Sequence, residues 1–257
     1  MDTVLKCEHL RVVFGGLASV SDFSIEVKRN EICGLIGPNG AGKTTVFNLL
    51  TGVYTPTSGK VFLNGKDLEG MSATARSHAG IGRTFQNIRL FKNISVLDNV
   101  LVGLNQSQNY GLHDALLRLP AFWKEEKAAE KKALELLSIF DMQDFAHVNA
   151  GNLPYGAQRR LEIVRALATK PDLLLLDEPA AGMNPAETAD LMCTIVEIRD
   201  KFHIAILLIE HDMNLVMGIC ENITVLNFGQ VIARGTPPEI QNNPVVVEAY
   251  LGKKKEG

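Results

Sequence analysis

Apolar and polar positions alternate in short segments over the first part of the chain, and turn residues separate these segments. The turn residues Gly15-Gly16 and Arg29-Asn30 bound the alternating runs, which predicts antiparallel strands. A later run, at residues 32–36, is apolar throughout and is typical of a buried strand. The pattern predicts strands over residues 4–14, 24–27, 31–36 and 60–63 and a helix over residues 44–50.

The region between about residues 87 and 155 has a different pattern. Its β-branched runs disappear, and small or apolar residues recur at helical spacing on one face: Ala129, Ala133, Leu136, Leu137 and Phe140. This pattern predicts a mostly helical insert. Residues 106–119 have weak periodicity and polar residues, so both a loop and a short helix stay open for that segment.

Strands and helices alternate again from Pro171 onward. The predicted strands cover residues 173–177, 205–209, 223–226 and 231–233, and the predicted helices cover residues 187–202 and 213–220. Because buried strands separated by helices form a parallel sheet with helices on both faces, the predicted fold class is α/β.

Composition and charge restrict the class of protein. The chain has 257 residues, of which 46% are hydrophobic and 21% charged, as in an ordinary globular protein. This length suits one large domain or a core with an inserted subdomain. The formal charge of −3 provides no overall positive field for a polyanion. We therefore expect no nucleic-acid partner, and any phosphate chemistry must come from a local site.

The cysteines and the apolar runs indicate in which cellular compartment the protein is expected. Cys7, Cys33, Cys193 and Cys220 are far apart and form no CxxC pair, so we expect buried apolar residues in a reducing compartment rather than a zinc site or disulfides. The first residues lack the apolar run of a signal peptide, and no run approaches the ~20 residues of a membrane span. We expect a cytoplasmic protein, with any membrane channel supplied by other chains.

A phosphate-binding loop follows the apolar run at residues 32–36. Its sequence, Gly37-Pro38-Asn39-Gly40-Ala41-Gly42-Lys43-Thr44, fits the pattern Gly-x-x-x-x-Gly-Lys-Ser/Thr between a strand and a helix. Glycines allow backbone N–H groups to surround phosphate oxygens, and the helix N-terminus adds positive charge. We expect Lys43 to contact the β- and γ-phosphates, Thr44 to bind Mg²⁺ and Thr45 to take part in nucleotide binding. The alternative is a glycine-rich turn with a chance lysine.

An acidic pair follows the four leucines at residues 173–176. Asp177 ends a predicted buried strand, where a carboxylate can hold Mg²⁺ beside a phosphate loop. Glu178 comes next and is placed to accept a proton from an attacking water. The alternative is that both acids cap the following helix.

Five further motifs accompany the loop and the acidic pair. They are Phe14 before Gly15-Gly16, Gln86 in Arg83-Thr84-Phe85-Gln86, Leu153-Pro154-Tyr155-Gly156-Ala157-Gln158, Ala181-Gly182-Met183-Asn184-Pro185, and His211 in Ile209-Glu210-His211-Asp212. In this order, and over nearly the whole chain, they resemble the ATP-binding cassette family, the ATP-hydrolysing subunits of ABC transporters. The resemblance implies that Phe14 stacks on adenine, that Gln86 joins the γ-phosphate and its metal to the membrane subunits, and that His211 is the switch histidine. The ordinary alternatives are a core phenylalanine, a structural histidine, and turn or cap residues at Gln86 and Asn184.

The resemblance also implies an architecture. It is a P-loop NTPase (RecA-like) fold in one ABC ATPase domain over residues 1–257, with a parallel sheet core, an N-terminal antiparallel β subdomain and an inserted α-helical subdomain. The nucleotide-binding core would comprise about residues 1–86 and 160–257, and the helical subdomain about residues 87–159.

The family's signature motif is the loosest match. Pro154 replaces its serine and Tyr155 its first glycine, whereas Gly156 is kept and Ala157 stands at its glutamine. Because proline has neither a hydroxyl nor an N–H, one phosphate contact is missing. The backbone N–H groups of Tyr155 and Gly156, at the start of a predicted helix, can still bind the phosphate. A partner with a complete signature would compensate in a mixed dimer.

The resemblance implies cofactors and partners. In the family the signature of one cassette closes over ATP held by another, which implies ATP and Mg²⁺ as cofactors and a second cassette, identical or different, as partner. Further implied partners are membrane permease subunits, which would contact Gln86 and residues 87–96, and indirectly a periplasmic solute-binding protein. The implied location is peripheral, on the cytoplasmic face of the inner membrane. The apolar residues Ile88, Leu90, Phe91 and Ile94 fit a core equally well.

Within the family, the segments 14–17, 82–91, 180–187 and 240–252 resemble the larger cassette of branched-chain amino acid importers. The expected function is therefore ATP hydrolysis that energises import of a small solute, branched-chain amino acids, through a separate permease. The alternative is a nucleotide-gated dimerising module with little hydrolysis, which Pro154 and Ala157 motivate. A DNA-repair ATPase is disfavoured because the insert has no sustained heptads.

Overall fold

The computed structural model describes residues 2–105 and 120–251, and it divides into two compact units. The core unit comprises Met1–Gln86 and Asp172–Gly257, and the helical unit comprises Asn87–Pro171. The helical unit ends twelve residues beyond position 159, where we expected its boundary. Its last helix, α6, runs without interruption through that position, from Tyr155 to Ala168. Among the described residues, no helix has the length and apolar character needed to span a membrane.

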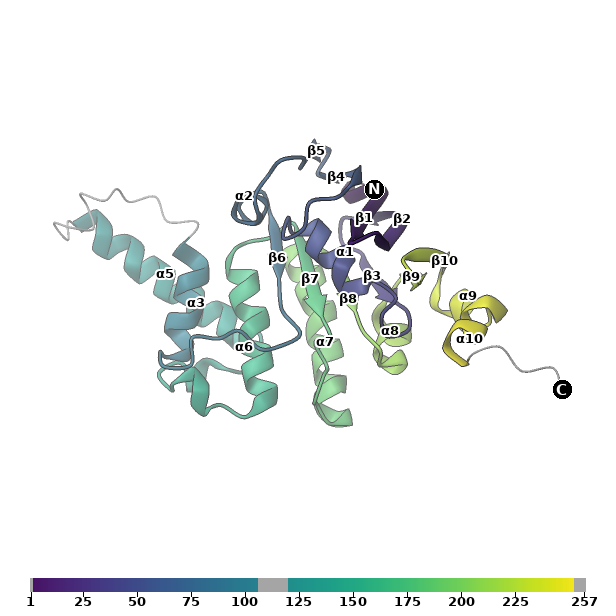
Figure 1. The fold of residues 1–257 in the computed structure, drawn as a ribbon. Coiled ribbons are helices and arrows are strands. Elements are labelled where there is room, and N and C mark those ends of the chain that lie inside the picture. The colour runs from purple at the N-terminus through teal and green to yellow at the C-terminus, as the bar shows by residue number, and fades with distance from the viewer. Residues whose placement is uncertain (1, 106–119, 252–257) are drawn as a thin grey trace. The chain divides into compact units, whose positions relative to one another are not determined.

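A ten-stranded sheet runs through the described part of the core unit, in the order β5-β4-β1-β2-β10-β9-β3-β8-β7-β6 (Figure 1). The strands are β1 (Thr3–Phe14), β2 (Leu17–Lys28), β3 (Ile32–Ile36), β4 (Ser58–Leu63), β5 (Lys66–Asp67), β6 (Ile81–Arg83), β7 (Leu173–Asp177), β8 (Ala205–Ile209), β9 (Asn222–Asn227) and β10 (Gln230–Gly235). Pairing is antiparallel among β1, β2, β4 and β5 and parallel from β6 through β7, β8 and β3 to β9. The α/β fold with an N-terminal antiparallel part and a parallel core, as predicted, is confirmed.

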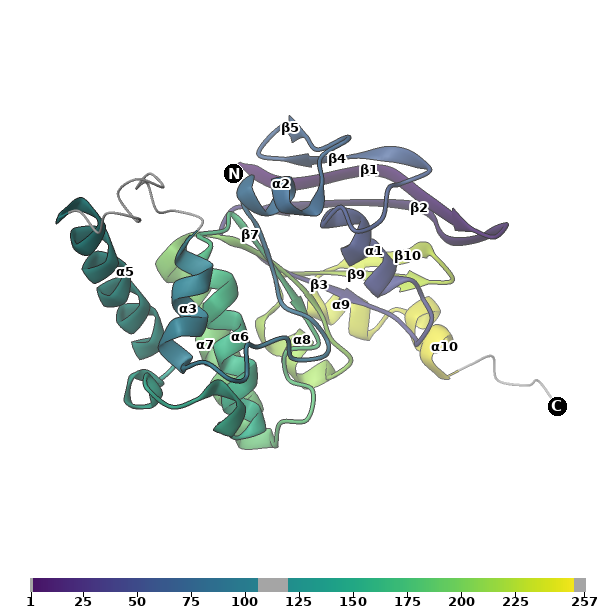
Figure 2. The same ribbon diagram turned by 60° about the vertical axis from the view of Figure 1, so that its left-hand side comes forward.

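Burial explains the difference between the two kinds of strand. Strands β3, β7 and β8 are buried at every position, as their continuous apolar sequences require, whereas β1 alternates buried and exposed residues along much of its length. The helices of the core unit are α1 (Lys43–Leu50), α2 (Ala73–His78), α7 (Pro185–Phe202), α8 (Met213–Ile219), α9 (Pro237–Gln241) and α10 (Pro244–Leu251). Figure 2 shows the long strands β1, β2 and β4 side by side, with α1 below them. Helix α1 buries four apolar side chains, so its N-terminal turn and the loop before it are firmly placed.

The helical unit is built from α3 (Val96–Leu104), α5 (Pro120–Ser138), α6 (Tyr155–Ala168) and two short 3₁₀ helices, η2 (Gln143–Phe145) and η3 (Ala150–Asn152). Helix α3 packs on α6 at Gly103, where a Cβ atom would lie 2.7 Å from the carbonyl oxygen of Arg165. Within α6 a fully buried ion pair joins Arg159 Nη1 to Glu162 Oε2 at 2.9 Å. The mostly helical character predicted for this region is present, and residues 106–119 lie outside the described part.

The apolar residues just after Gln86 are not core residues. Phe91 is 53% exposed, and Ile88, Leu90 and Ile94 are only partly buried. The guanidinium of Arg165 lies over the Phe91 ring, 5.6 Å from its centre. Burial within this unit therefore does not account for the phenylalanine.

The cysteine expectation is right for three positions and wrong for one. All four cysteines are free; Cys7, Cys33 and Cys220 are buried, and burial raises the pKa of each of these thiols. Cys193 is exposed. The reason is its place on α7, whose buried stripe consists of Thr188, Leu191, Ile195 and Ile198 at helical spacing.

Candidate nucleotide-binding site

The loop between β3 and α1 depends on three glycines with positive φ. These φ angles are 152° at Gly37, 79° at Gly40 and 105° at Gly42. A Cβ atom would lie 2.0 Å from the carbonyl oxygen of Leu226 at Gly37 and 2.7 Å from that of Ser19 at Gly42. A side chain at either position would displace the backbone, so the glycines are required by geometry and are not an ordinary flexible turn.

Backbone contacts anchor this loop to its neighbours. Ala41 is buried; its N–H donates to the Pro38 carbonyl at 3.1 Å, and its own carbonyl accepts from Gly229 at 2.9 Å. Asn39 and Gly40 are exposed. The loop therefore has a fixed inner side and an open outer side.

The side chain of Lys43 is held by two carbonyl groups of the loop. Its Nζ donates to the carbonyl oxygens of Gly37 at 2.6 Å and Pro38 at 3.1 Å. Burial lowers the pKa of Lys43, and the nearby carboxylates of Glu178 and Asp177 act in the opposite direction. The ammonium thus contacts two loop carbonyls and is within electrostatic reach of the acidic pair.

The two threonines that follow have different surroundings. Thr44 is exposed in the first turn of α1. The hydroxyl of Thr45 lies 3.0 Å from that of Ser19 on β2, so its side chain is engaged within the protein. Helix α1 begins at Lys43 with Gly42 as N-cap and without a side-chain cap, which leaves its first N–H groups oriented toward the loop.

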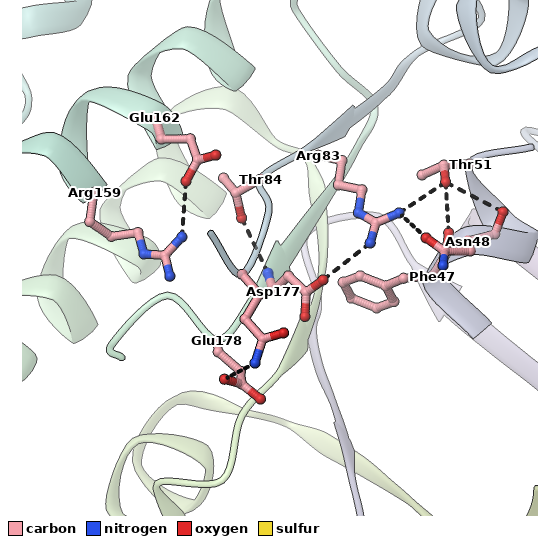
Figure 3. A network of polar contacts seen from close by, with 10 residues as sticks. Phe47, Asn48, Thr51, Arg83, Thr84, Arg159, Glu162, Asp177 and Glu178 are labelled. Atoms are coloured by element: carbon pink, nitrogen blue, oxygen red, sulfur yellow. Dashed lines mark hydrogen bonds and ion pairs between the residues drawn. The ribbon is translucent and has the colours of Figure 1, made fainter. Parts of the chain in front are cut away.

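The acidic pair lies at the carboxyl end of β7 (Figure 3). Asp177 is 2% exposed, and its Oδ2 accepts a hydrogen bond from Arg83 Nη2 at 3.1 Å. Glu178 is the first residue past the strand; it has a φ of 49°, and its N–H donates to the Ile209 carbonyl at 2.9 Å. This left-handed conformation changes the direction of the chain directly after Asp177. The next helix, α7, is capped by Asn184, so the two acids do not cap it.

Gln86 meets Glu178, although 92 residues separate them in the chain. Gln86 Nε2 donates to Glu178 Oε2 at 3.0 Å. Parallel pairing of β6 with β7 explains the contact, because the carboxyl ends of both strands then lie at the same edge of the sheet. Gln86 is therefore more than a turn residue.

His211 joins the same edge from the next strand. Its Nδ1 lies 3.9 Å from Glu178 Oε1 and 3.8 Å from Glu210 Oε2, and the side chain is 67% exposed. Glu210 is buried and accepts from the N–H groups of Ala180 at 2.8 Å and His211 at 3.0 Å. Sequence analysis missed the role of Glu210 in joining these loops. Its position directly after a buried strand, like that of Asp177, was the available signal.

Phe14 is half exposed at the end of β1 and is not a core residue. Its ring contacts that of Tyr54 edge to face, with centres 5.1 Å apart and planes inclined at 69°. This arrangement fixes the ring and leaves surface on which a flat apolar group can stack.

Tyr155 and Gly156 belong to the helical unit, at the first turn of α6. The N-cap is Pro154, and this helix too has no side-chain cap. Tyr155 is 48% exposed, and Gly156 is buried. Gln158 Nε2 donates to the Leu153 carbonyl at 2.8 Å, which stabilises the turn before the helix.

By contrast Asn184, in the segment after Glu178, caps α7 through the N–H groups of Ala186 and Glu187.

The residues expected to bind a metal offer oxygen donors only. They are the hydroxyl of Thr44, the carboxylate of Asp177 and the amide oxygen of Gln86, which is the chemistry that Mg²⁺ prefers. In the described part of the chain, no group of three or more histidine, cysteine or acidic side chains could hold a metal by itself. This set fits Mg²⁺ that is bound jointly with substrate phosphates.

Comparison with known proteins extends these observations. The sequence model of the ABC transporter family matches residues 20–181, and that of the branched-chain amino acid ATP-binding cassette transporters matches residues 230–256. The high-affinity branched-chain amino acid transport ATP-binding protein LivG of Salmonella typhimurium is 48% identical over 97% of this chain and 98% of its own. The corresponding protein BraF of Pseudomonas aeruginosa is 45% identical over 97% of this chain and 98% of its own.

A solved structure agrees in fold. The crystal structure of the ADP conformation of MJ1267, an ATP-binding cassette of an ABC transporter, superposes with a TM-score of 0.85 at 31% identity, covering 98% of this chain and 100% of that chain. The family predicted from the motifs is thereby confirmed. The chain belongs to the ABC transporter family and is one of its ATP-binding subunits, an ATPase.

Proposed function

We propose that this ATPase energises the import of branched-chain amino acids through a separate membrane permease. Its relatives LivG and BraF are described as branched-chain amino acid transport ATP-binding proteins, and the C-terminal 230–256 segment matches a family of the same description. Because a permease and a solute-binding protein would select the amino acid, the contribution of this chain is to bind and hydrolyse ATP.

Nucleotide binding is assigned to the core unit. Backbone N–H groups of the glycine-rich loop and of the first turn of α1 surround the phosphates, and Lys43 moves its ammonium from the loop carbonyls to the β- and γ-phosphates. Phe14 supplies the surface on which adenine stacks. The positive φ angles of Gly37 and Gly42 support this assignment, because they give the loop a backbone conformation in which successive N–H groups can turn toward an anion.

Mg²⁺ would be held by Thr44 and Asp177, with Gln86 nearby, and would neutralise charge on the β- and γ-phosphates. Glu178 accepts a proton from the attacking water. The water oxygen bonds to the γ-phosphorus, and the bond between the γ-phosphorus and the bridging oxygen breaks, so that this oxygen leaves with ADP. His211 is placed to sense the γ-phosphate from the neighbouring strand. The observation that carries this mechanism is the meeting of Gln86, Glu178 and His211 at one edge of the sheet.

A second cassette completes the site in this proposal. The first turn of α6, at Tyr155 and Gly156, binds the γ-phosphate of ATP held by the partner cassette, and two such contacts close the dimer. The uncapped N-terminus of α6 supports this role, since its N–H groups have no side-chain acceptor. The partner is a second copy or a different cassette.

We place the chain peripherally at the cytoplasmic face of the inner membrane. The segment after Gln86, with its exposed Phe91, would contact the permease. The Gln86 side chain at the nucleotide site and the permease contact would then lie on one continuous stretch of chain. A periplasmic solute-binding protein would act only indirectly, by delivering the amino acid to the other side of the permease. The nucleotide-binding core would then carry out the ATP chemistry, and the helical subdomain would contact the permease.

Affinity purification from detergent-solubilised membranes, followed by reconstitution, tests this function. We expect a hydrophobic permease and a second cassette in the eluate, and ATP-dependent uptake of leucine, isoleucine or valine by vesicles that contain the complex. Uptake should be lost with the Lys43→Met variant and kept with Lys66→Met, an exposed lysine on β5. Purification without any membrane protein, or uptake that survives Lys43→Met, would contradict the proposal.

The alternative, a dimerising module with little hydrolysis, is not favoured. The ATPase family match covers most of the chain, and Glu178, Gln86 and His211 lie together. The changes at Pro154 and Ala157 remain compatible with hydrolysis, because backbone N–H groups rather than those side chains would contact phosphate.

A further inference from the structure

Arg83 is a buried cation at the end of the edge strand β6. Its side chain is 8% exposed and makes an ion pair with Asp177, whose side chain is 3% exposed, at an Nη2–Oδ2 distance of 3.1 Å. Its guanidinium lies 5.6 Å from the centre of the Phe47 ring and 5.0 Å from that of the Phe85 ring. A buried carboxylate needs such a partner, because an isolated charge in the interior is costly.

The same guanidinium also binds the phosphate-loop helix. Nη1 donates to Asn48 Oδ1 at 2.8 Å and to Thr51 Oγ1 at 3.2 Å (Figure 3). Asn48 lies in α1, the helix whose first turn carries Thr44, and Thr51 is its C-cap residue. One planar group therefore contacts both elements that carry the proposed Mg²⁺ ligands.

The sheet order makes this bridge important. Strand β3, which leads into α1, and strand β7, which ends in Asp177, are separated by β8. Backbone pairing therefore does not join the two ligand-carrying elements directly. Thr84, the residue after Arg83, adds a backbone contact, because its hydroxyl oxygen accepts from the Asp177 N–H at 3.2 Å.

We propose that Arg83 is a positioning residue, which holds one oxygen of Asp177 and fixes that carboxylate relative to α1 so that the other oxygen faces Mg²⁺·ATP. This inference rests on the proposed roles of Thr44 and Asp177. A rigid fork suits the task, since arginine presents several donors in one plane, whereas the single amine of lysine cannot reproduce both sets of contacts. Supporting residues of this kind change metal affinity by about 10- to 100-fold when they are removed.

A second buried arginine provides a matched control. Arg76 is 4% exposed and donates to the carbonyl oxygens of Leu49, Leu50 and Leu68. It therefore binds the C-terminal end of the same helix through backbone carbonyl groups rather than through the acidic pair. Loss of Arg76 tests what general damage to α1 does to nucleotide binding.

The experiment compares the affinity of a non-hydrolysable fluorescent ATP analogue with Mg²⁺ and with EDTA. The full-length wild-type chain and the variants Arg83→Met, Arg83→Lys and Arg76→Lys are titrated after circular dichroism has established that each is folded. The ratio of the two affinities isolates the contribution of Mg²⁺, because general damage to the loop lowers both. We expect the ratio to fall about 10-fold in Arg83→Met, less in Arg83→Lys, and to stay at the wild-type value in Arg76→Lys.

Each outcome has a defined meaning. If the wild-type chain shows no Mg²⁺-dependent gain, the proposed nucleotide site itself fails. If the wild type shows the gain and Arg83→Met keeps it within twofold, or Arg76→Lys loses it equally, the positioning role is wrong. Should Arg83→Met not fold, Arg83→Lys decides: an unchanged ratio overturns the proposal. In an Asp177→Asn background, Arg83→Lys should produce no further loss, and an additive loss would also contradict it.

Discussion

The phosphate loop before α1 and the signature loop before α6 prepare a helix N-terminus in two different ways. At the phosphate loop, three glycines have positive φ, and Gly42 is itself the N-cap. At the signature loop, Pro154 is the N-cap, with a φ of −55° that any residue can adopt. Neither helix has a side-chain cap, whereas side chains of Ser72, Ser95, Asn184 and Asp212 cap α2, α3, α7 and α8.

The difference explains why this chain can match the phosphate-loop pattern fully and the signature pattern only loosely. A loop that surrounds phosphate needs backbone geometry that only glycine adopts without strain. A helix end that approaches phosphate from one side needs only free N–H groups, which Tyr155 provides as well as glycine would. The comparison leads to predictions in which changes near the phosphate loop have large effects and changes in the signature loop have small ones.

The largest effect should come from Glu178→Gln, because neither helix end supplies a base. Loss of a general base lowers turnover about 10²- to 10⁴-fold, while the amide keeps the size of the side chain. ATP binding should persist, and an ATP-bound dimer should accumulate in size-exclusion chromatography. Glu69→Gln, which changes an exposed glutamate that lies 3.8 Å from Lys60, is the matched control. Unchanged turnover would exclude Glu178 as the base.

Lys43→Met should lower turnover by roughly 100- to 1,000-fold, the range for loss of one preorganised donor to a developing charge. Unlike Glu178→Gln, it should also weaken ATP binding measured by calorimetry, since Lys43 contacts the phosphates in the ground state as well. Lys66→Met should change neither quantity. Equal ATP affinity in Lys43→Met and wild type would show that the ammonium does not leave the loop carbonyls for phosphate.

Gly42→Ala tests the strained backbone of the phosphate loop. A non-glycine residue at a φ of 105° costs about 1–3 kcal/mol in the free energy of unfolding, and the contact at 2.7 Å with the Ser19 carbonyl adds to this. Gly70→Ala is the control, because Gly70 has a φ of 71° and open space around its Cβ position. Urea unfolding should show the larger loss for Gly42→Ala. An equal loss in both variants would mean that the close backbone contact has no energetic effect.

The smallest effect is expected in the signature loop. Pro154→Ser adds a hydroxyl that can donate one hydrogen bond to phosphate, which is worth about 1.5 kcal/mol at the low end of the range for a charged acceptor, or roughly a 10-fold rise in turnover. Pro154→Ala removes the ring without adding a donor and should leave turnover near wild type. If serine and alanine give the same rate, the hydroxyl has no role at this position.

Sequence predicted most of the fold because the buried strands have continuous apolar runs, as in the four leucines at residues 173–176, and the glycines mark the phosphate loop. It identified the end of β7 as an acidic site for the same reason. It missed Arg83, since an isolated charge beside apolar residues gives no indication of whether it will be buried. It also missed Glu210, although the position of this residue directly after the buried strand β8 was a signal for it. Their functions arise from pairings between strands that are far apart in the chain, such as β6 with β7.

Cys193 illustrates the opposite error. Small apolar character predicted burial, but helical phase decides exposure, and Cys193 lies off the stripe that α7 buries. The division between the two units shows the same limitation, because α6 begins before position 159 and continues past it. A boundary at about position 159 therefore cuts through a helix.

All the roles proposed for this chain depend on the glycine loop and the acidic pair together binding and hydrolysing Mg²⁺·ATP. Phosphate release by the purified chain, alone and with a partner cassette, tests it most directly when measured with Mg²⁺, with EDTA and in the Glu178→Gln variant. We expect phosphate release that requires both Mg²⁺ and Glu178. Release at the same rate in EDTA, or at the same rate in Glu178→Gln, would contradict it.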